Sequence, residues 1–587
     1  MSVIMDESLK GEVTLEHVEI GSSSRRSLKG ILHRIWKYKL HYVIVIPALL
    51  LITLFKIFPL ITGIVMSFKN YVVFRGLWGS PWVGFDNFFQ LFRNAEFQNA
   101  FTNTLIIKLA VMTICGMIAF VVALAVSGVR SSKLRNLTTT LILMPYFIPS
   151  VVVAYVISHM LAPVQLEKLN LHLFILGDPK FFLPMLVIVE ALKTCGIPIL
   201  LALAAIESKR AVLLTQNIAS ESYISTYVIP AIRAILAFTV FQLSTILSTD
   251  FELVSNLYNP LVYDVADTID TFSFRSGLIS GKYNVASTIG MIQFVVQLLG
   301  TFAAYLLVRR LFFHDLFNKS KGIETIQLNS KRRHTIGIVV STLYAIGIIV
   351  LIYYICIQPF TVRSASGLNL WQALPVSRYV DYFVINFAAV IVNLFITATL
   401  AYPLTVKDLP GRNIYKLVLL FVLAAGSGTI SEYVTIKSLG MINTIYPQMI
   451  FGFFAILNVF VVKSMFNSKY ASLKEQNAAQ GRGELYTFFT LFIPKVWKIL
   501  IALGVLQFVS LCNSYFVSSL YMSNSNTFSP IMVFRTMTTG LNKMGVEPGD
   551  PIVMQIAAII TLPSLVLLLV FRKWLTSEVL ISQARKM

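Results

Sequence analysis

Two ionisable residues stand out because they lie inside a strongly apolar run of the chain. Glu190 and Lys193 are three residues apart within MLVIVEALKTCGIPILLALAA, residues 185–205. Residues at this spacing share one face of a helix, so an acid and a base there can neutralise each other. Charges in apolar surroundings are costly and are by default functional candidates. We expect Glu190 and Lys193 to form a structural ion pair. The alternative is that both side chains line a polar path through the protein.

The chain contains no pattern that would direct such groups to catalysis. It has no GxxxxGK[ST] phosphate loop, no HExxH metal motif and no GxSxG nucleophile motif. Cys115, Cys195, Cys356 and Cys512 are dispersed without a CxxC pair, and we expect them to pack as buried thiols. We predict no metal site, no cofactor and no enzyme activity on this chain. If ATP drives the protein, its hydrolysis must take place on a separate subunit.

The elements that position these groups are expected to be membrane helices. Of the 587 residues, 56% are hydrophobic and only 13% are charged, with a mean hydropathy of +0.75, whereas soluble proteins carry about 25% charged residues. The formal charge of +21 comes from short basic clusters beside apolar runs. Such clusters are typical of the cytosolic ends of transmembrane helices rather than of nucleic-acid binding. The sequence therefore predicts an all-α integral membrane protein.

Twelve stretches reach the length of about 20 mostly apolar residues that a membrane span requires. They lie near residues 42–66, 104–127, 138–162, 181–206, 229–248, 286–308, 335–357, 382–405, 415–435, 442–465, 496–517 and 553–571. The stretches at 229–248 and 415–435 are the weakest, because they contain Arg233 and Glu432. We expect Lys56 and Lys108 to snorkel to the interface and Glu432 to be solvated at the outer end of its span.

The basic clusters also predict an orientation and a division of the chain. With twelve spans and both termini cytosolic, all the clusters fall on one side, as the positive-inside rule requires. We predict a cytosolic tail over 1–40, a first transmembrane domain over 41–312, a cytosolic linker over 313–334 and a second transmembrane domain over 335–587. In each domain a long cytosolic stretch between the fourth and fifth spans ends in Ile-Pro, a weak internal symmetry typical of two-part transporters.

The most distinctive of these stretches is EQNAAQGRGELYTFFTLFIP, residues 475–494. Gly481 and Gly483 would end one short helix, and Glu484 begins another. Pro494 opens the next span, where a missing N–H costs least. On the residues alone, an ordinary cytosolic loop is an equally good interpretation.

The spacing of Glu475, Gly481 and Ile493-Pro494 resembles the EAA…G…I-LP loop in permeases of binding-protein-dependent ATP-binding cassette (ABC) importers. In that family the loop forms a short coupling helix that docks on the ATP-binding subunit. Gln476 and Asn477 stand where the family usually has Ala-Ala, and Gln480 stands where it usually has Asp. The resemblance implies a loop that still docks, onto an ATPase that could be specialised.

Other blocks resemble two different partner permeases of type I, maltose-type carbohydrate importers. AYPLTVKDLPGR (401–412) and SGTISEYVTIKSLGMINTIYP (427–447) are similar to one partner. GSPWVGFDNFFQLF (79–92) and FELVSNLYNPLVYDVADTIDTFSFRSGL (251–278) are similar to the other. The resemblance implies that two six-helix permease domains, usually made separately, are fused in one chain.

The corresponding stretch of the first half, residues 204–230, departs further from the family pattern. It keeps Ile229-Pro230, but Asn217 stands where the family has Gly, and no Glu-Ala-Ala precedes it. Asn can replace Gly in the left-handed conformation. We therefore expect two unlike coupling loops, with the docking of the first left open.

Polar and aromatic residues lie in or just beyond the fifth span of each half. Sugars are bound by hydrogen bonds and aromatic faces, which these side chains could supply, although packing or an interfacial position is the commoner role for any single one. The candidates for a translocation path are Glu190, Lys193, Gln242, Asn256, Tyr258, Gln507, Asn513 and Tyr515.

The resemblance implies a complete importer around this chain, in the bacterial cytoplasmic membrane. Two ATP-binding cassette ATPase subunits would carry ATP and Mg, and an extracytoplasmic solute-binding protein would deliver the substrate, an oligosaccharide. The acidic segment 249–285 is a candidate docking surface for that binding protein. The alternative function is a twelve-span secondary carrier driven by an ion gradient.

Overall fold

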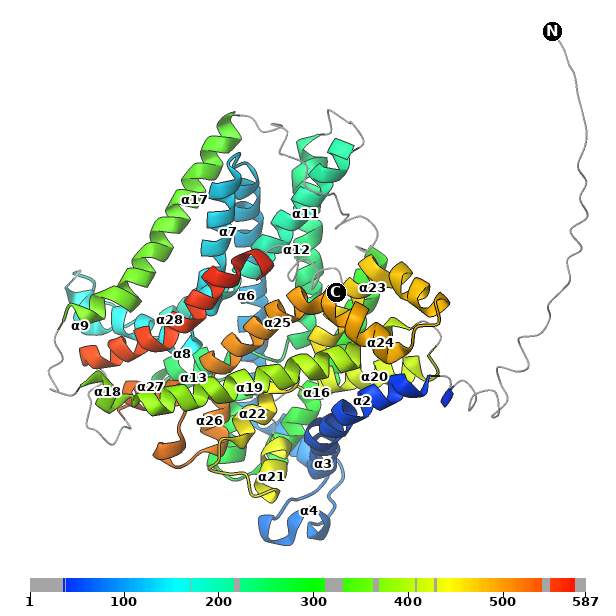
Figure 1. The fold of residues 1–587 in the computed structure, drawn as a ribbon. Helices are drawn as coiled ribbons and strands as arrows, with labels where there is room; N and C mark the ends of the chain where they lie inside the picture. Colours follow the sequence, from blue (N-terminus) through cyan, green and yellow to red (C-terminus); the bar gives the residue numbers. More distant parts are fainter. Residues whose placement is uncertain are drawn as a thin grey trace, which may run out of the picture.

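The computed structural model describes residues 35–36, 38–168, 170–215, 222–311, 331–362, 369–406, 409–426, 430–540 and 549–575. Over these residues every regular element is a helix, and the β pairing is one isolated bridge between Lys69 and Trp82. The helices pack into a single bundle (Figure 1). The prediction of an all-α membrane fold is confirmed.

The two halves repeat the same order of long helices. The first half contains α2 (Lys39–Ile52) with α3 (Phe58–Ser67), α6 (Ala95–Ser127), α7 (Ser132–Phe147) with α8 (Ser150–Met160), α10 (Pro179–Thr194) with α11 (Gly196–Thr215), α12 (Ile229–Gln242) and α16 (Tyr283–Leu311). The second half contains α17 (Lys331–Ile352), α19 (Val376–Ala401), α20 (Arg412–Ala424) with α21 (Ile430–Ser438), α22 (Tyr446–Gly452) with α23 (Ile456–Ala479), α25 (Ile493–Asn513) and α28 (Pro551–Trp574).

Eleven of the twelve predicted spans have a counterpart among the described helices. Within the described residues, nine stretches are long and apolar enough to cross a membrane, and the number rises to eleven if each of two bent pairs is one span. The pair α7–α8 bends by 87° and the pair α10–α11 by 46°. The predicted span at 415–435 corresponds to the two shorter helices α20 and α21, on either side of residues outside the described part. The count of twelve spans and the cytosolic location of both termini stay predictions.

Four short π-helical turns repeat at equivalent places in the two halves, and each is followed two residues later by proline. Proline lacks the N–H that would bond to the carbonyl four residues earlier, so the preceding turn can widen. One pair of turns lies within the first span of each half, and the other comes directly before Ile-Pro. The turns are Thr53–Ile57, Tyr353–Ile357, Ile224–Val228 and Phe488–Phe492, which precede Pro59, Pro359, Pro230 and Pro494.

The first helix of each half packs on the other half. α17 lies against α6 and α7 on one flank of the bundle, and α2 lies against α19 on the other (Figure 1). Glycines allow the closest approach: a Cβ at Gly128 would lie 2.6 Å from the carbonyl oxygen of Arg333, and one at Gly337 would lie 2.6 Å from that of Ala125. Small residues at such contacts let helix backbones approach within membranes.

Candidate coupling segment and translocation interface

The coupling segment of the second half, residues 471–494, has a sharply defined break. α23 ends at Ala479, and Gly481 follows in the left-handed region with φ +70°. The Arg482 amide donates to the Asn477 carbonyl at 3.2 Å, which closes the helix end. A residue with a Cβ is strained at such a φ. The glycine that the sequence singled out is therefore required by the backbone itself.

Beyond this break the chain turns back into the bundle. The short helix α24 (Glu484–Thr487) leads through a π-helical turn into α25, where Pro494 is exposed near the helix start. Glu475, Gln476, Gln480 and Gly481 are exposed, and Asn477 is half-buried. The residues predicted to dock are thus on the surface of this end of the bundle.

Glu484 fixes the segment to the first helix of the other half. The Tyr402 hydroxyl donates to Glu484 Oε2 at 2.5 Å, and His41 Nε2 lies 3.2 Å from the same oxygen. The His41 ring is fully buried and stacks on Tyr402, with centroids 5.4 Å apart. Lys474 Nζ lies 4.1 Å from the centre of the Tyr402 ring, and burial lowers the pKa of this lysine to about 8. We call His41, Tyr402, Lys474 and Glu484 the anchor cluster.

A different kind of contact connects the first-half coupling segment to the second half. Asn217 lies outside the described residues, whereas Pro230 is buried at the start of α12. The guanidinium of Arg333, near the start of α17, lies 3.9 Å from the centre of the Tyr223 ring, just before the π-helical turn. This cation–π contact takes the place of the anchor cluster.

Lys193 pairs with Asp250 rather than with Glu190, so the predicted Glu190–Lys193 pair is wrong. Lys193 Nζ donates to Asp250 Oδ2 at 2.7 Å, and Ser150 Oγ, which also contacts the Lys193 amine, donates to the same oxygen at 2.7 Å. Asp250 is the N-cap of α13 (Phe251–Leu257), which brings its carboxylate within reach of α10. Glu190 points into a separate cavity of about 60 Å³, which Gln242 also lines.

The two halves meet where α13 touches the break between α25 and α26 (Phe516–Tyr521). Glu252 Oε1 accepts hydrogen bonds from Ser514 Oγ at 2.6 Å and from the Phe516 amide at 3.1 Å. These bonds join residues more than 260 positions apart. Because α13 and α26 follow the fifth span of each half, the contact lies at equivalent positions of the two halves.

Several predicted path residues belong to this contact. The Tyr515 hydroxyl lies 2.6 Å from Ser255 Oγ and accepts from Asn256 Nδ2 at 2.9 Å. Asn513 Nδ2 donates to the Phe147 carbonyl at 2.9 Å, again between the halves. We call the bonds made by Glu252, Asn256, Asn513 and Tyr515 the inter-half network.

Two other predicted path residues lie away from the inter-half network. Tyr258 packs on Tyr263, with centroids 4.9 Å apart, and Gln507 Nε2 donates to the Gly452 carbonyl at 3.4 Å within the second half. These contacts match the packing role that the sequence left open for any single residue of the set.

The structure adds charged residues that we had assigned to solvent or to the membrane interface. Lys56 and Glu432 form an ion pair of 2.7 Å between the halves, and each side chain is 7% exposed. The expected snorkelling of Lys56 and solvation of Glu432 are therefore wrong, because each charge satisfies the other. Asp250 and Glu252 were expected only as part of the acidic segment 249–285, and their contacts inside the protein were missed. An acidic residue directly before the helix-like run FELVSNL was the N-cap signal that could have drawn attention to Asp250.

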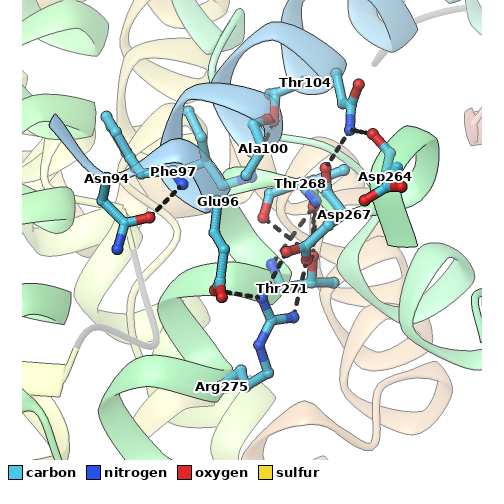
Figure 2. A network of polar contacts seen from close by, with 12 residues as sticks. Asn94, Glu96, Phe97, Ala100, Thr104, Asp264, Asp267, Thr268, Thr271 and Arg275 are labelled. Carbon is cyan, nitrogen blue, oxygen red and sulfur yellow. Dashed lines mark hydrogen bonds and ion pairs between the residues drawn. The ribbon is translucent and has the colours of Figure 1, made fainter. Parts of the chain in front are cut away.

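Most of the acidic side chains in the segment 249–285 are buried or half-buried within the protein. Asp267 is buried, and Arg275 donates to its two carboxylate oxygens at 3.2 and 2.7 Å. Figure 2 shows Arg275 directed at Asp267 and at Glu96 of α6. Of the five acidic side chains in this segment, Asp264 alone is exposed. The picture of an acidic outer surface is thus corrected: this segment is an anchored part of the fold.

Known proteins similar to this chain include transport permeases. No protein-family model matches it. It is 27% identical over 292 residues to the protein LplB of Bacillus subtilis, with 47% of this chain and 90% of LplB covered. It is 26% identical over 284 residues to the polygalacturonan/rhamnogalacturonan transport system permease protein YteP of B. subtilis, with 46% and 88% covered. It is 37% identical over 116 residues to the sn-glycerol-3-phosphate transport system permease protein UgpA of Pectobacterium atrosepticum, with 20% and 38% covered.

Among solved structures, the chain is 28% identical to a chain in the crystal structure of a bacterial alginate ABC transporter in complex with its pentasaccharide-bound periplasmic protein. The match covers 47% of this chain and 96% of that chain, with a TM-score of 0.41. The alignments with LplB and YteP include 90% and 88% of the relative within about half of this chain. Together with the helical multi-span fold, they show that this chain is a multi-pass protein of the bacterial cytoplasmic membrane that is similar to transport permeases.

Proposed function

We propose that this chain fuses both permease halves of one ABC importer and moves an oligosaccharide inward, with ATP and Mg bound by two separate ATPase subunits. The observation that carries the proposal is the repeated coupling geometry. In each half a π-helical turn and Ile-Pro connect an outlying segment to the fifth span, and the first helix of the other half contacts that segment.

This geometry suggests how an ATPase would move the protein. A force on the exposed residues 475–481 would pass through α24 to the anchor cluster, and through His41 to α2. The same force would pass through the π-helical turn into α25, which ends at the inter-half network. Both halves would therefore move when one coupling segment moves.

The inter-half network would act as a gate in this mechanism. Its bonds join α13 and the end of α7 in the first half to the end of α25 and the residues just after it in the second half, away from the coupling segments. The network consists mostly of single hydrogen bonds, each of which contributes about 1 kcal/mol. Such bonds are weak enough to exchange for bonds to a ligand or to water when the halves rock apart.

An oligosaccharide is the substrate class that the relatives support. YteP is named for the transport of polygalacturonan and rhamnogalacturonan. An extracytoplasmic solute-binding protein would deliver the sugar to the side that carries the inter-half network, where the exposed Asp264 and the loops near it remain a candidate docking surface.

The proposal is tested by purifying the full chain from its native membranes under mild detergent. An ATPase subunit with a phosphate-binding loop should co-purify at two copies per chain. In a variant with Gln476→Cys, a short thiol cross-linker should join the chain to that ATPase, whereas Glu167→Cys at the end of the short helix α9 (Pro163–Glu167) should not. Absence of any ATPase, or cross-linking only from position 167, would contradict the proposal.

A further inference from the structure

A cavity of about 350 Å³ lies next to the inter-half network, where elements of both halves meet. The first half contributes α3, the start of α13, α15 (Ile269–Phe274) and α16; the second half contributes α21 and α26. This volume falls within the range of small-ligand pockets. Glu252 and Phe516 line the cavity and also belong to the inter-half contact, so the cavity and the gate share residues.

Among the described residues that line this cavity, none offers a free cation to an anionic ligand. The one basic residue among them, Lys56, is engaged by Glu432 at 2.7 Å and also donates to the Gly426 carbonyl at 3.2 Å. Asp250 is engaged by Lys193. The ionisable lining residues are Lys56, Asp250, Glu252, Asp270 and Glu432, four acids and one base.

Two of these acids have no ion-pair partner within the described part of the chain. Glu252 accepts from Ser514 and from the Phe516 amide, and Asp270 accepts from the Thr249 amide at 2.9 Å and from Gln293 at 2.8 Å. Burial raises the pKa of Glu252 to about 7 and also raises the pKa of Asp270. Both carboxyl groups are thus already costly to ionise, and a further negative charge beside them would add repulsion.

The remaining lining suits a polyhydroxylated ligand without charge. The rings of Phe251, Phe274 and Phe516 line one wall, and the Phe251 centroid lies 5.1 Å from each of the other two. Aromatic faces pack against the apolar faces of sugar rings, and carboxyl oxygens accept hydrogen bonds from sugar hydroxyls. Glu252 Oε1 also accepts hydrogen bonds from Ser514 and from the Phe516 amide. A sugar hydroxyl that donates to Glu252 would therefore compete with these bonds, which join the two halves.

We propose that this cavity binds uncharged glycans and excludes uronate-containing ones, so that this chain selects a substrate class different from the acidic glycan for which its relative YteP is named. The proposal rests on the importer function proposed above. It assigns Glu252 and Asp270 as specificity-determining residues, and it links occupancy of the cavity to opening of the inter-half network.

The test compares two tetrasaccharides that differ only in the oxidation state of carbon 6: α-1,4-galactotetraose and tetragalacturonate. The full chain is placed in lipid nanodiscs, and binding is measured at pH 7.5 by saturation-transfer difference NMR, which detects weak ligands. The neutral tetramer should bind at least about tenfold more tightly than the acidic one. Equal binding, tighter binding of tetragalacturonate, or no binding of either would overturn the proposal.

Variants separate charge from shape. In Glu252→Gln with Asp270→Asn, the side-chain volumes and one acceptor oxygen in each side chain remain while both charges are removed, so the preference for the neutral tetramer should fall severalfold. Glu167→Gln, an exposed acid outside the cavity, should leave it unchanged. An unchanged preference in the double variant contradicts the assignment. Preferred binding of the acidic tetramer by a chain that still co-purifies with an ATPase would refute the charge selection and leave the importer function standing.

Discussion

The two coupling segments of this chain share a geometry and differ in chemistry. Both pass through a π-helical turn into Ile-Pro, and both are contacted by the first helix of the opposite half. In the second half the contact is a half-buried acid, an imidazole and a phenol; in the first it is an arginine over a tyrosine ring. In the proposed mechanism the path for force is therefore set by backbone architecture, which allows the side chains at the two contacts to diverge.

The difference has an energetic consequence. A hydrogen bond to a charged group contributes about 1.5–3 kcal/mol, and the value at Glu484 should be near the low end because this side chain is 31% exposed. A cation–π contact near the surface contributes about 0.5–1 kcal/mol. We therefore expect the second-half segment to be the more firmly held and the more sensitive to substitution.

The largest effect is expected at Gly481. Gly481→Val places a β-branched residue at φ +70°, so the end of α23 must rearrange, and uptake should fall by at least about tenfold while the protein still inserts into the membrane. Gly481→Asn should retain most uptake, because Asn tolerates this conformation. Gly483→Val is the matched control, since Gly483 has φ −62°. Normal uptake by Gly481→Val would remove the basis for the coupling assignment.

The two cross-half contacts are compared next by paired substitutions. His41→Phe keeps a ring stacked on Tyr402 but removes the contact with Glu484, and should destabilise the protein by about 1–2 kcal/mol. Arg333→Met keeps the length of the side chain but removes the cation, and should cost about 0.5–1 kcal/mol. Thermal unfolding in detergent measures both. A larger loss from Arg333→Met would reverse the expected ranking of the two segments.

The inter-half network lies away from the two coupling segments, and a substitution there tests whether it acts as a gate. Tyr515→Phe removes the hydroxyl that Ser255 and Asn256 contact and should cost about 1 kcal/mol, with a rise in ATP hydrolysis in the absence of substrate. Tyr446→Phe, an exposed tyrosine, serves as the control. If Tyr515→Phe leaves both stability and basal hydrolysis unchanged, the network is not a gate.

The smallest effect is expected in the first-half segment. Asn217→Val should reduce uptake by less than about threefold, because the sequence around position 217 has already departed from the coupling pattern. Uptake and substrate-stimulated ATP hydrolysis are both measured, with Gly481→Val assayed in parallel. Equal losses at the two positions would show that both segments couple alike.

Much of the fold could be predicted because it depends on local signals. Apolar length located eleven of the spans, and the Ile-Pro pairs located the start of the fifth span in each half. The need for glycine at 481 also follows from a local backbone conformation. Bends were harder to predict: α7 and α8 read as one apolar run, although Pro149 marks where the helix turns by 87°.

The candidate site was predicted less well, because its contacts join distant parts of the chain. Spacing along one helix suggested that Lys193 would pair with Glu190, but the fold brings Asp250 to it instead. Lys56 and Glu432 are 376 residues apart, and nothing local to either predicts their ion pair. The exchange of first helices between the halves, which makes His41 part of the anchor cluster, likewise depends on tertiary packing alone.

The central claim is that an ATPase drives this chain through its coupling segments. The most direct test measures uptake of a labelled neutral oligosaccharide into membrane vesicles that contain the complete system and its binding protein. Uptake should require ATP on the side of the coupling segments, be abolished by vanadate, and continue when an ionophore collapses the ion gradients. Uptake that survives vanadate and disappears with the ionophore would contradict the account and identify a secondary carrier.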